Sequence, residues 1–317
     1  MDGRTEAAVQ WLLESEEPAI RMMARRDLLG EPEGETEAEV AAQAEAEAKA
    51  AASADETPIG PKVNALLSDD LTEHPYRKWT GTHWRLVALA ELAVPPGDPR
   101  VHRMADRVLD AYTAPAYRKI VRVDGLARRH ASIDGNALAA CCRIGRKADP
   151  RVRLLAELLI DCQWPDGGWN CDPKATRRSS FHETLPAMWG LHEYGHPAAQ
   201  RGADLLLEHR LFKSPRTGAV INERWLDLRW PPYWHYDILQ ALVILSRMGR
   251  LDDPRAADAL DEVERQRLRD GRWRARGYWW RPPGSATYPE AVDWWRGGPS
   301  EMVTLNALRV LCAANRL

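Results

Sequence analysis

The chain has 317 residues, with 44 Lys or Arg against 46 Asp or Glu, which gives a net charge of −2. This balance argues against nucleic acid or an anionic membrane surface as a partner. No stretch approaches the roughly 20 apolar residues that span a bilayer, so we expect no membrane insertion. The cysteines lack CxxC spacing and the N-terminus lacks a signal-peptide pattern, which together predict a cytoplasmic protein with free thiols.

The N-terminal part of the chain predicts a helix over residues 18–29, followed by a segment of unusual composition. Residues 31–57 are rich in Ala and Glu, a pattern that fits either a surface helix or a mobile segment. No later segment carries a strand pattern, and no long linker divides the chain. We therefore predict a single all-α domain over residues 1–317.

The tripeptide Asp-Pro-Arg recurs at 98–100, 149–151 and 253–255, each time before an amphipathic stretch. Asp is a favoured N-cap and Pro a favoured first helical residue, so each copy predicts a helix start. The first two copies are 51 residues apart and the third follows after 104, about twice that spacing. His196-Pro197 supplies a fourth start near the missing position. The resulting period of about fifty residues predicts a fold built from repeats.

A second set of predicted helices alternates with these and is richer in Ala, Leu, Met and Trp, as expected for helices buried on most sides. They are predicted over 18–29, 82–92, 133–143, 179–191, 233–248 and 300–312. Pairing each with a more charged outer helix gives six helical hairpins, which predicts an (α/α)6 barrel, also called an α-toroid. The inner helices of such a barrel run parallel, so their N-termini should surround one end of a shared cavity.

Two loops share a Gln, an Asp-Gly turn and a Trp: CQWPDGGWNCDP at 162–173 and QRLRDGRW at 266–273. They resemble the QW repeat of triterpene (squalene–hopene) cyclases, whose relatives include protein prenyltransferase β-subunits. The resemblance covers most of the chain at the level of architecture, and it implies an enzyme acting on a hydrophobic or isoprenoid-like small molecule. The acidic DxDD and DDxxD motifs of those enzymes are absent from this sequence. We therefore predict that the QW residues stabilise the fold and carry no chemistry.

Chemistry is expected where the inner helices begin, because their unpaired backbone N–H groups favour anionic groups. His130, His182 and His235 begin three consecutive inner helices, a recurrence that exceeds what capping requires. The residues predicted to perform acid–base chemistry are Asp134, His182, Glu183, His235 and Asp237. The residues predicted to bind the substrate are Trp79, Thr82, His83, His130, Asn136, Trp234, Tyr236, Trp279, Trp294, Trp295 and Glu301.

Three alternatives stay open at this point. The first is a zinc enzyme that binds the metal through His182, His235 and a carboxylate. Prenyltransferase β-subunits hold zinc with Asp, Cys and His, and the resemblance matches His235 to that histidine. The Asp-x-Cys partner is missing, and the adjacent Cys171-Asp172 is predicted to be a structural part of its loop. The second alternative is a carbohydrate-active (α/α)6 hydrolase or lyase with paired carboxylates. The third is a ligand-binding barrel without catalysis.

Residues 272–298 carry five Trp, two Tyr and five Arg, with too many Pro and Gly for one helix. A loop this long in a compact domain is usually functional, so we predict a lid over the cavity. The competing interpretation is that these indoles seal the last hairpin. Contact with single-stranded nucleic acid is a third choice, disfavoured by the balanced net charge.

Overall fold

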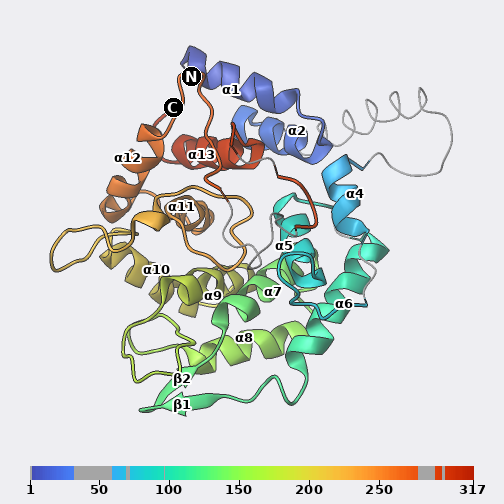
Figure 1. Cartoon of the computed structure of the whole chain (residues 1–317), viewed down its shortest axis with the longest axis vertical. Helices are drawn as coiled ribbons and strands as arrows, with labels where there is room; N and C mark the ends of the chain where they lie inside the picture. The colour runs from blue at the N-terminus through green and yellow to red at the C-terminus, as the bar shows by residue number, and fades with distance from the viewer. Residues whose placement is uncertain (1, 32–58, 69–71, 96, 278–289, 295–296) are drawn as a thin grey trace, which may run out of the picture.

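The computed structural model describes residues 2–31, 59–68, 72–95, 97–277, 290–294 and 297–317. Most of the described residues are helical, which confirms the all-α prediction (Figure 1). The Ala/Glu-rich segment 31–57 lies outside the description apart from its first residue, and the predicted lid 272–298 is described only at its two ends.

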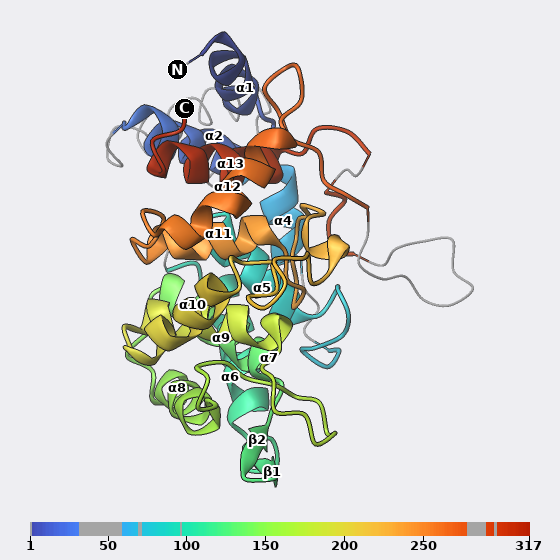
Figure 2. The ribbon, with the colours of Figure 1, turned by 90° about the vertical axis from the view of Figure 1, so that its left-hand side faces the viewer.

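The helices are joined by loops of very different length, and the longest fully described one runs between Glu208 and Ile238 (Figures 1 and 2). Their bounds are α1 (Gly3–Leu13), α2 (Pro18–Ala24), α4 (Pro61–Leu67), α5 (Thr82–Glu91), α6 (Pro99–Thr113), α7 (Ala131–Arg143), α8 (Pro150–Cys162), α9 (Phe181–Tyr194), α10 (Ala198–Glu208), α11 (Ile238–Arg247), α12 (Ala257–Arg265) and α13 (Glu301–Ala313). A π-helical turn (Arg25–Leu29) extends α2, and 3-10 turns occupy Glu223–Trp225 and Pro254–Ala256. None of the described helices is both long and apolar enough to cross a bilayer.

A short antiparallel hairpin of β1 (Val121–Val123) and β2 (Leu126–Arg128) interrupts the helical pattern, and it corrects the expectation that no strand is present. Its turn is Asp124-Gly125, and both residues have positive φ, at 51° and 79°. Asp-Gly is the sequence that favours this type of two-residue hairpin turn. Three-residue strands are too short to produce a visible alternating pattern, which is why the sequence did not reveal them.

The predicted Asp-Pro helix starts are confirmed. The side chains of Asp98 and Asp149 accept hydrogen bonds from the backbone N–H two residues later, at 2.7 Å and 2.9 Å, and so cap α6 and α8. Asp253 makes the same contact at 3.0 Å, although there the chain forms a 3-10 turn before α12 begins. The predicted helix 233–248 begins later than expected, at Ile238, because Asp237 is its N-cap.

Alternate helices differ in burial as predicted. In α11, every residue from Ile238 to Leu245 is buried, whereas α6 buries only one face. Helix α7 packs against α5 and α9, and α13 packs against α11 and α2, while α6 contacts α8. Figure 1 shows α6, α8, α10 and α12 lying outside α5, α7, α9 and α11.

The two QW loops fasten outer helices to their neighbours. Trp169 and Trp273 are buried, and each indole donates a hydrogen bond to a backbone carbonyl of the preceding outer helix, at 2.8 Å and 2.7 Å. Gln163 donates to the carbonyls of Gly167 and Ala198, which ties its turn to α10. These contacts give the QW residues a role in holding the outer helices in place.

Helices α7 and α9 approach each other unusually closely at Gly135. A Cβ at this position would lie 2.2 Å from the carbonyl oxygen of Pro186, in the middle of α9. Gly190 faces the same contact, since its own Cβ would lie 2.5 Å from the oxygen of Gly135. This close contact fixes the position of the first turn of α9 relative to the first turn of α7.

Candidate functional site

The starts of α5, α7, α9 and α11 are joined by contacts between residues far apart in sequence. The amide of Asn136 donates to the carbonyl of Tyr233 at 2.9 Å, and the backbone N–H of Ser132 donates to Glu183 Oε2 at 2.7 Å. Trp79 stacks on Tyr233 with ring centroids 4.2 Å apart. We call this region the mouth, and it comprises residues 79–83, 130–136, 181–183 and 233–237.

His182 and His235 lie side by side in the mouth, with ring centroids 6.1 Å apart. His235 stacks on Trp234 at 3.9 Å, and burial lowers its pKa to about 2. Burial also lowers the pKa of His182, whose Nδ1 accepts a 2.9 Å hydrogen bond from the backbone N–H of Tyr236. Both imidazoles are therefore neutral at pH 7. Because Nδ1 of His182 is an acceptor, its proton must lie on Nε2.

The start of α5 is packed too tightly to bind a ligand in this structure. Trp79, Thr82 and His83 are buried, and Trp79 and Trp84 meet edge-on at 5.3 Å. His83 is 0% exposed, and burial lowers its pKa to about 3. Neither of its ring nitrogens has a hydrogen-bond partner within the described residues. These predicted substrate-binding residues form part of the protein interior.

Two of the predicted carboxylates are also fully buried. Asp134 forms an ion pair with Arg129 at 2.5 Å and accepts a 3.0 Å hydrogen bond from the hydroxyl of Tyr117. Asp237 caps α11 by accepting from the N–H of Gln240 at 3.0 Å, and burial raises its pKa to about 7. Both side chains are 0% exposed, so these two carboxylates do not face an open groove.

The remaining predicted substrate-binding residues occupy structural contacts or lie outside the description. The buried Tyr236 donates its hydroxyl to the carbonyl of Leu211 at 2.6 Å. Trp294 packs edge-on against Trp230, and Glu301 forms a 3.2 Å ion pair with a lysine of α4. The two residues outside the described part of the chain are Trp279 and Trp295.

A second polar group lies at the edge of the mouth and includes Cys171, which the sequence predicted to be a structural part of its loop. One potential ligand atom each from His130, Cys171 and Glu183 lies within 4.8 Å of the other two. The Glu183 carboxylate beside His130 raises the pKa of that imidazole. Burial and the same carboxylate raise the pKa of the Cys171 thiol to about 12. All five cysteines of the chain are free.

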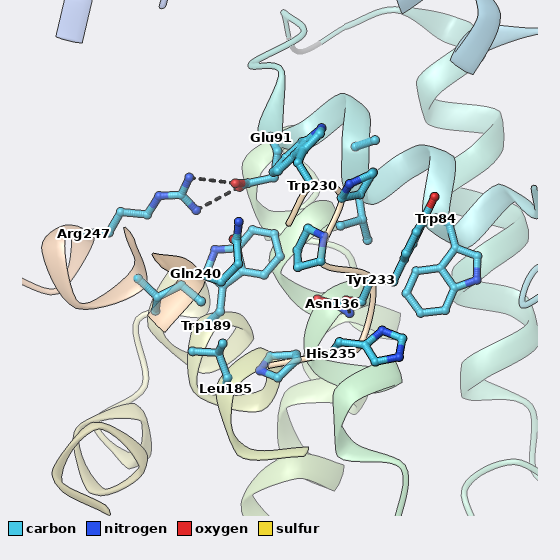
Figure 3. A pocket seen from close by; sticks show the side chains of 16 residues that line it. Trp84, Glu91, Asn136, Leu185, Trp189, Trp230, Tyr233, His235, Gln240 and Arg247 are labelled. Carbon is cyan, nitrogen blue, oxygen red and sulfur yellow. Dashed lines mark hydrogen bonds and ion pairs between the residues drawn. The ribbon is translucent and has the colours of Figure 1, made fainter. Parts of the chain in front are cut away.

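A narrow pocket extends from the mouth along the inner helices (Figure 3). His235, Trp84 and Asn136 line one end, and Glu91 with Arg247 lines the other. The Arg247 guanidinium holds Glu91 through two hydrogen bonds, at 2.9 Å and 3.0 Å. The cavity volume is about 30 Å³, which is room for little more than a water molecule.

A larger cavity of about 710 Å³ opens beside the first turn of α9. Its size is in the range of small-molecule sites, which run from about 300 to 1,000 Å³. The apolar part of its wall consists of Phe181, Leu205, Ile221 and Trp225. The charged part consists of Arg177, Arg178, Arg216 and Asp166, and the side chains of His182 and His209 also line the cavity. Three guanidinium groups against one carboxylate make this an electropositive site with an apolar wall.

Sequence reasoning missed Cys171 and the three arginines of this cavity. Arg177-Arg178 immediately precedes the predicted start of α9, and that placement was a usable signal. Arg216 lies in a separate loop, and its approach to α9 depends on tertiary structure.

No protein-family model matches this sequence, and a search of curated proteins finds no significant match.

Proposed function

We propose that the chain forms an (α/α)6 ring like that of the triterpene cyclases and prenyltransferase β-subunits. Support comes from the alternation of buried and amphipathic helices and from the contacts between neighbours in the series α5–α7–α9 and α11–α13–α2. The hydrogen bonds of Trp169 and Trp273 in the two QW loops add to this support. An experimental structure that resolves the whole chain tests this arrangement directly. A helical fold with the buried helices in two separate layers would contradict it.

Within this ring, we propose an enzyme that acts on a hydrophobic, isoprenoid-like small molecule carrying an anionic group. One observation carries the proposal: the 710 Å³ cavity combines an aromatic and aliphatic wall with Arg177, Arg178 and Arg216. The apolar wall would hold the hydrocarbon, and the arginines would bind phosphate or carboxylate oxygens.

Two residues of the mouth also line this cavity, Phe181 and His182, and of these His182 carries the polar side chain. Its neutral ring carries the proton on Nε2, because Nδ1 accepts from the N–H of Tyr236. A neutral imidazole in this state donates a hydrogen bond to an oxygen on which negative charge develops, as an oxyanion-binding group does. His182 would therefore act as a donor and polarise the substrate, and His235 would support it from the buried side.

The binding experiment compares farnesyl diphosphate, farnesol and inorganic pyrophosphate as probes, by following the tryptophan fluorescence of the full-length protein. We expect the diphosphate ester to bind most tightly, since it alone engages both parts of the wall. Each arginine removed should cost about tenfold in affinity, the loss of one charge-assisted hydrogen bond. The variants are Arg177→Ala and Arg178→Ala, with Arg103→Ala on the outer surface of α6 as the matched control.

Equal binding of farnesol and farnesyl diphosphate, or unchanged affinity in both arginine variants, would contradict the proposal. Catalysis is tested by incubating the bound probe with the wild-type protein and the His182→Ala variant, and identifying products by mass spectrometry. Binding without any turnover would favour the ligand-binding alternative over an enzyme.

A further inference from the structure

Three chain segments bring a metal-ligating set together at the mouth. His130 is the residue before α7, Glu183 lies in the first turn of α9, and Cys171 lies in the loop between α8 and α9. One imidazole nitrogen, one thiol sulfur and one carboxylate oxygen all lie within 4.8 Å of one another. Among the residues that the structure describes, this is the one group of three His, Cys, Asp or Glu with such spacing.

The carboxylate is held in place by the protein backbone. The N–H of Ser132 donates to Oε2 of Glu183 at 2.7 Å, while Oε1 lies 3.9 Å from Nδ1 of His130. The backbone contact is a typical outer-shell interaction that orients a metal ligand. It persists because Gly135 allows α7 and α9 to approach closely.

The cysteine is positioned by the loop on either side of it. The carbonyl of Asn170 accepts from the backbone N–H of Arg129 at 3.2 Å, which joins this loop to the start of α7. The Asn170 side chain accepts from the N–H of Asp172 at 2.8 Å and donates to the carbonyl of Arg178 at 2.8 Å. Cys171 therefore lies between two anchored neighbours, next to the His130 and Glu183 side chains.

The exposure of the three groups favours a site with one open position. Glu183 is buried and Cys171 is half-buried, whereas the His130 side chain is 69% exposed. Three protein ligands with one open position form the pattern of catalytic zinc sites, in which water takes the fourth place. Ligand atoms around tetrahedral zinc lie about 3.6 Å apart, given bonds of about 2.0–2.3 Å. The three ligand atoms, at most 4.8 Å apart, would have to move by about 1 Å to reach that spacing, and the exposed His130 ring can turn toward the other two.

We propose that His130, Cys171 and Glu183 bind a zinc ion, with water as the fourth ligand. This donor set differs from the zinc alternative left open by the sequence, in which His182, His235 and a carboxylate bind the metal. In His182, Nδ1 already accepts a backbone hydrogen bond from Tyr236. The inference goes beyond the proposed function, because the metal ligands do not line the 710 Å³ cavity and metal binding needs no substrate.

The experiment measures metal on the full-length protein. The protein is purified from zinc-supplemented culture, analysed by inductively coupled plasma mass spectrometry, then stripped with a chelator and titrated with Zn²⁺ against a chromophoric competitor. We expect about one zinc ion per chain. Replacing the zinc with Co²⁺ should give the visible bands of a tetrahedral ion and a near-ultraviolet thiolate-to-cobalt band that reports a cysteine ligand.

The variants Cys171→Ser, His130→Ala and Glu183→Gln should each weaken zinc binding by more than the roughly 10–100-fold that loss of an outer-shell partner costs. Cys171→Ser should also abolish the thiolate band. The matched controls are Cys312→Ser, an exposed thiol on α13, and His182→Ala, and both should keep wild-type affinity. Circular dichroism verifies that every variant is folded.

The proposal is overturned if the folded wild-type protein binds no stoichiometric zinc after reconstitution. It is also overturned if Cys171→Ser retains the thiolate band, or if His182→Ala removes the metal while His130→Ala does not. The outcome is separable from the proposed function, because binding of farnesyl diphosphate is measured independently on the metal-free protein.

Discussion

Replacing Gly135 by Ala tests how closely α7 and α9 must pack. In an exposed helix, this change stabilises by about 1 kcal/mol through helix propensity. Here the added Cβ would lie 2.2 Å from the oxygen and 2.3 Å from the carbon of the Pro186 carbonyl, and 2.4 Å from the nitrogen of Ala187. Carbon contacts normally lie at about 3.5 Å, so α9 would have to move by more than about 1 Å.

The atoms in the way all belong to the backbone of α9, so no side-chain rotation relieves the clash. Overpacking of this kind costs about 1–3 kcal/mol, and the rigid neighbours place Gly135 at the upper end. After the gain in helix propensity is subtracted, we expect the free energy of unfolding to fall by about 2 kcal/mol. Zinc affinity should fall as well, since the displacement separates Ser132 and Glu183.

The measurement is urea unfolding followed by circular dichroism, with m-values compared to confirm that both proteins lose similar surface. Gly3→Ala is the matched control, because Gly3 is also helical and a Cβ there meets no atom within 4 Å. The control should be as stable as the wild type or slightly more stable. If Gly135→Ala behaves like Gly3→Ala, the close contact between α7 and α9 is not real.

Three further predictions concern buried groups. The pKa of Asp237 is raised to about 7 from an ordinary 3.8, so between these pH values the folded state binds more protons than the unfolded state, and this group should make stability fall as pH rises from about 4 to 7. Asp237→Asn should remove this pH dependence while still capping α11. If the free energy of unfolding in urea keeps the same dependence on pH in the variant, Asp237 is not its source. Glu91→Ala should lower the free energy of unfolding by about 3–5 kcal/mol, because it leaves the Arg247 guanidinium without its two hydrogen bonds to this carboxylate. In the same urea assay, the double variant Glu91→Leu with Arg247→Met should recover most of that loss. Trp169→Phe should cost about 1–3 kcal/mol in thermal unfolding, because it leaves the Leu159 carbonyl unpaired in the interior, and a loss near zero would mean that the QW contact adds no stability.

Features encoded by neighbouring residues were predictable from the sequence. The Asp-Pro helix starts depend on a side chain reaching a backbone N–H only two residues away, as at Asp98 and Asp149. In the first QW loop, Trp169 donates its hydrogen bond to the carbonyl of Leu159, only ten residues earlier in the chain, so the contact lies within one helix and the turn that follows it. The difference between buried and amphipathic helices follows from the periodicity of apolar residues.

The candidate site was only partly predictable, because its properties depend on contacts across the fold. The recurrence of histidines led to His130, His182 and His235, and two of these are neighbours. Burial decided the rest: it placed His83 in the interior, and it turned Asp134 into an ion-pair partner of Arg129. Sequence patterns identify the residues that begin a helix, but they do not reveal which loop will pack against those residues.

The Glu91–Arg247 pair at the far end of the narrow pocket has a consequence for how the protein responds to salt. The bond joins the last turn of α5 to the last turn of α11, and Arg143 lies 3.8 Å from the same carboxylate. Glu91 is buried, and the narrow pocket beside the pair holds little more than one water molecule. Dissolved ions should therefore screen this attraction much less than they screen the exposed ion pairs on the surface, and high salt should leave this link between the two helix ends intact.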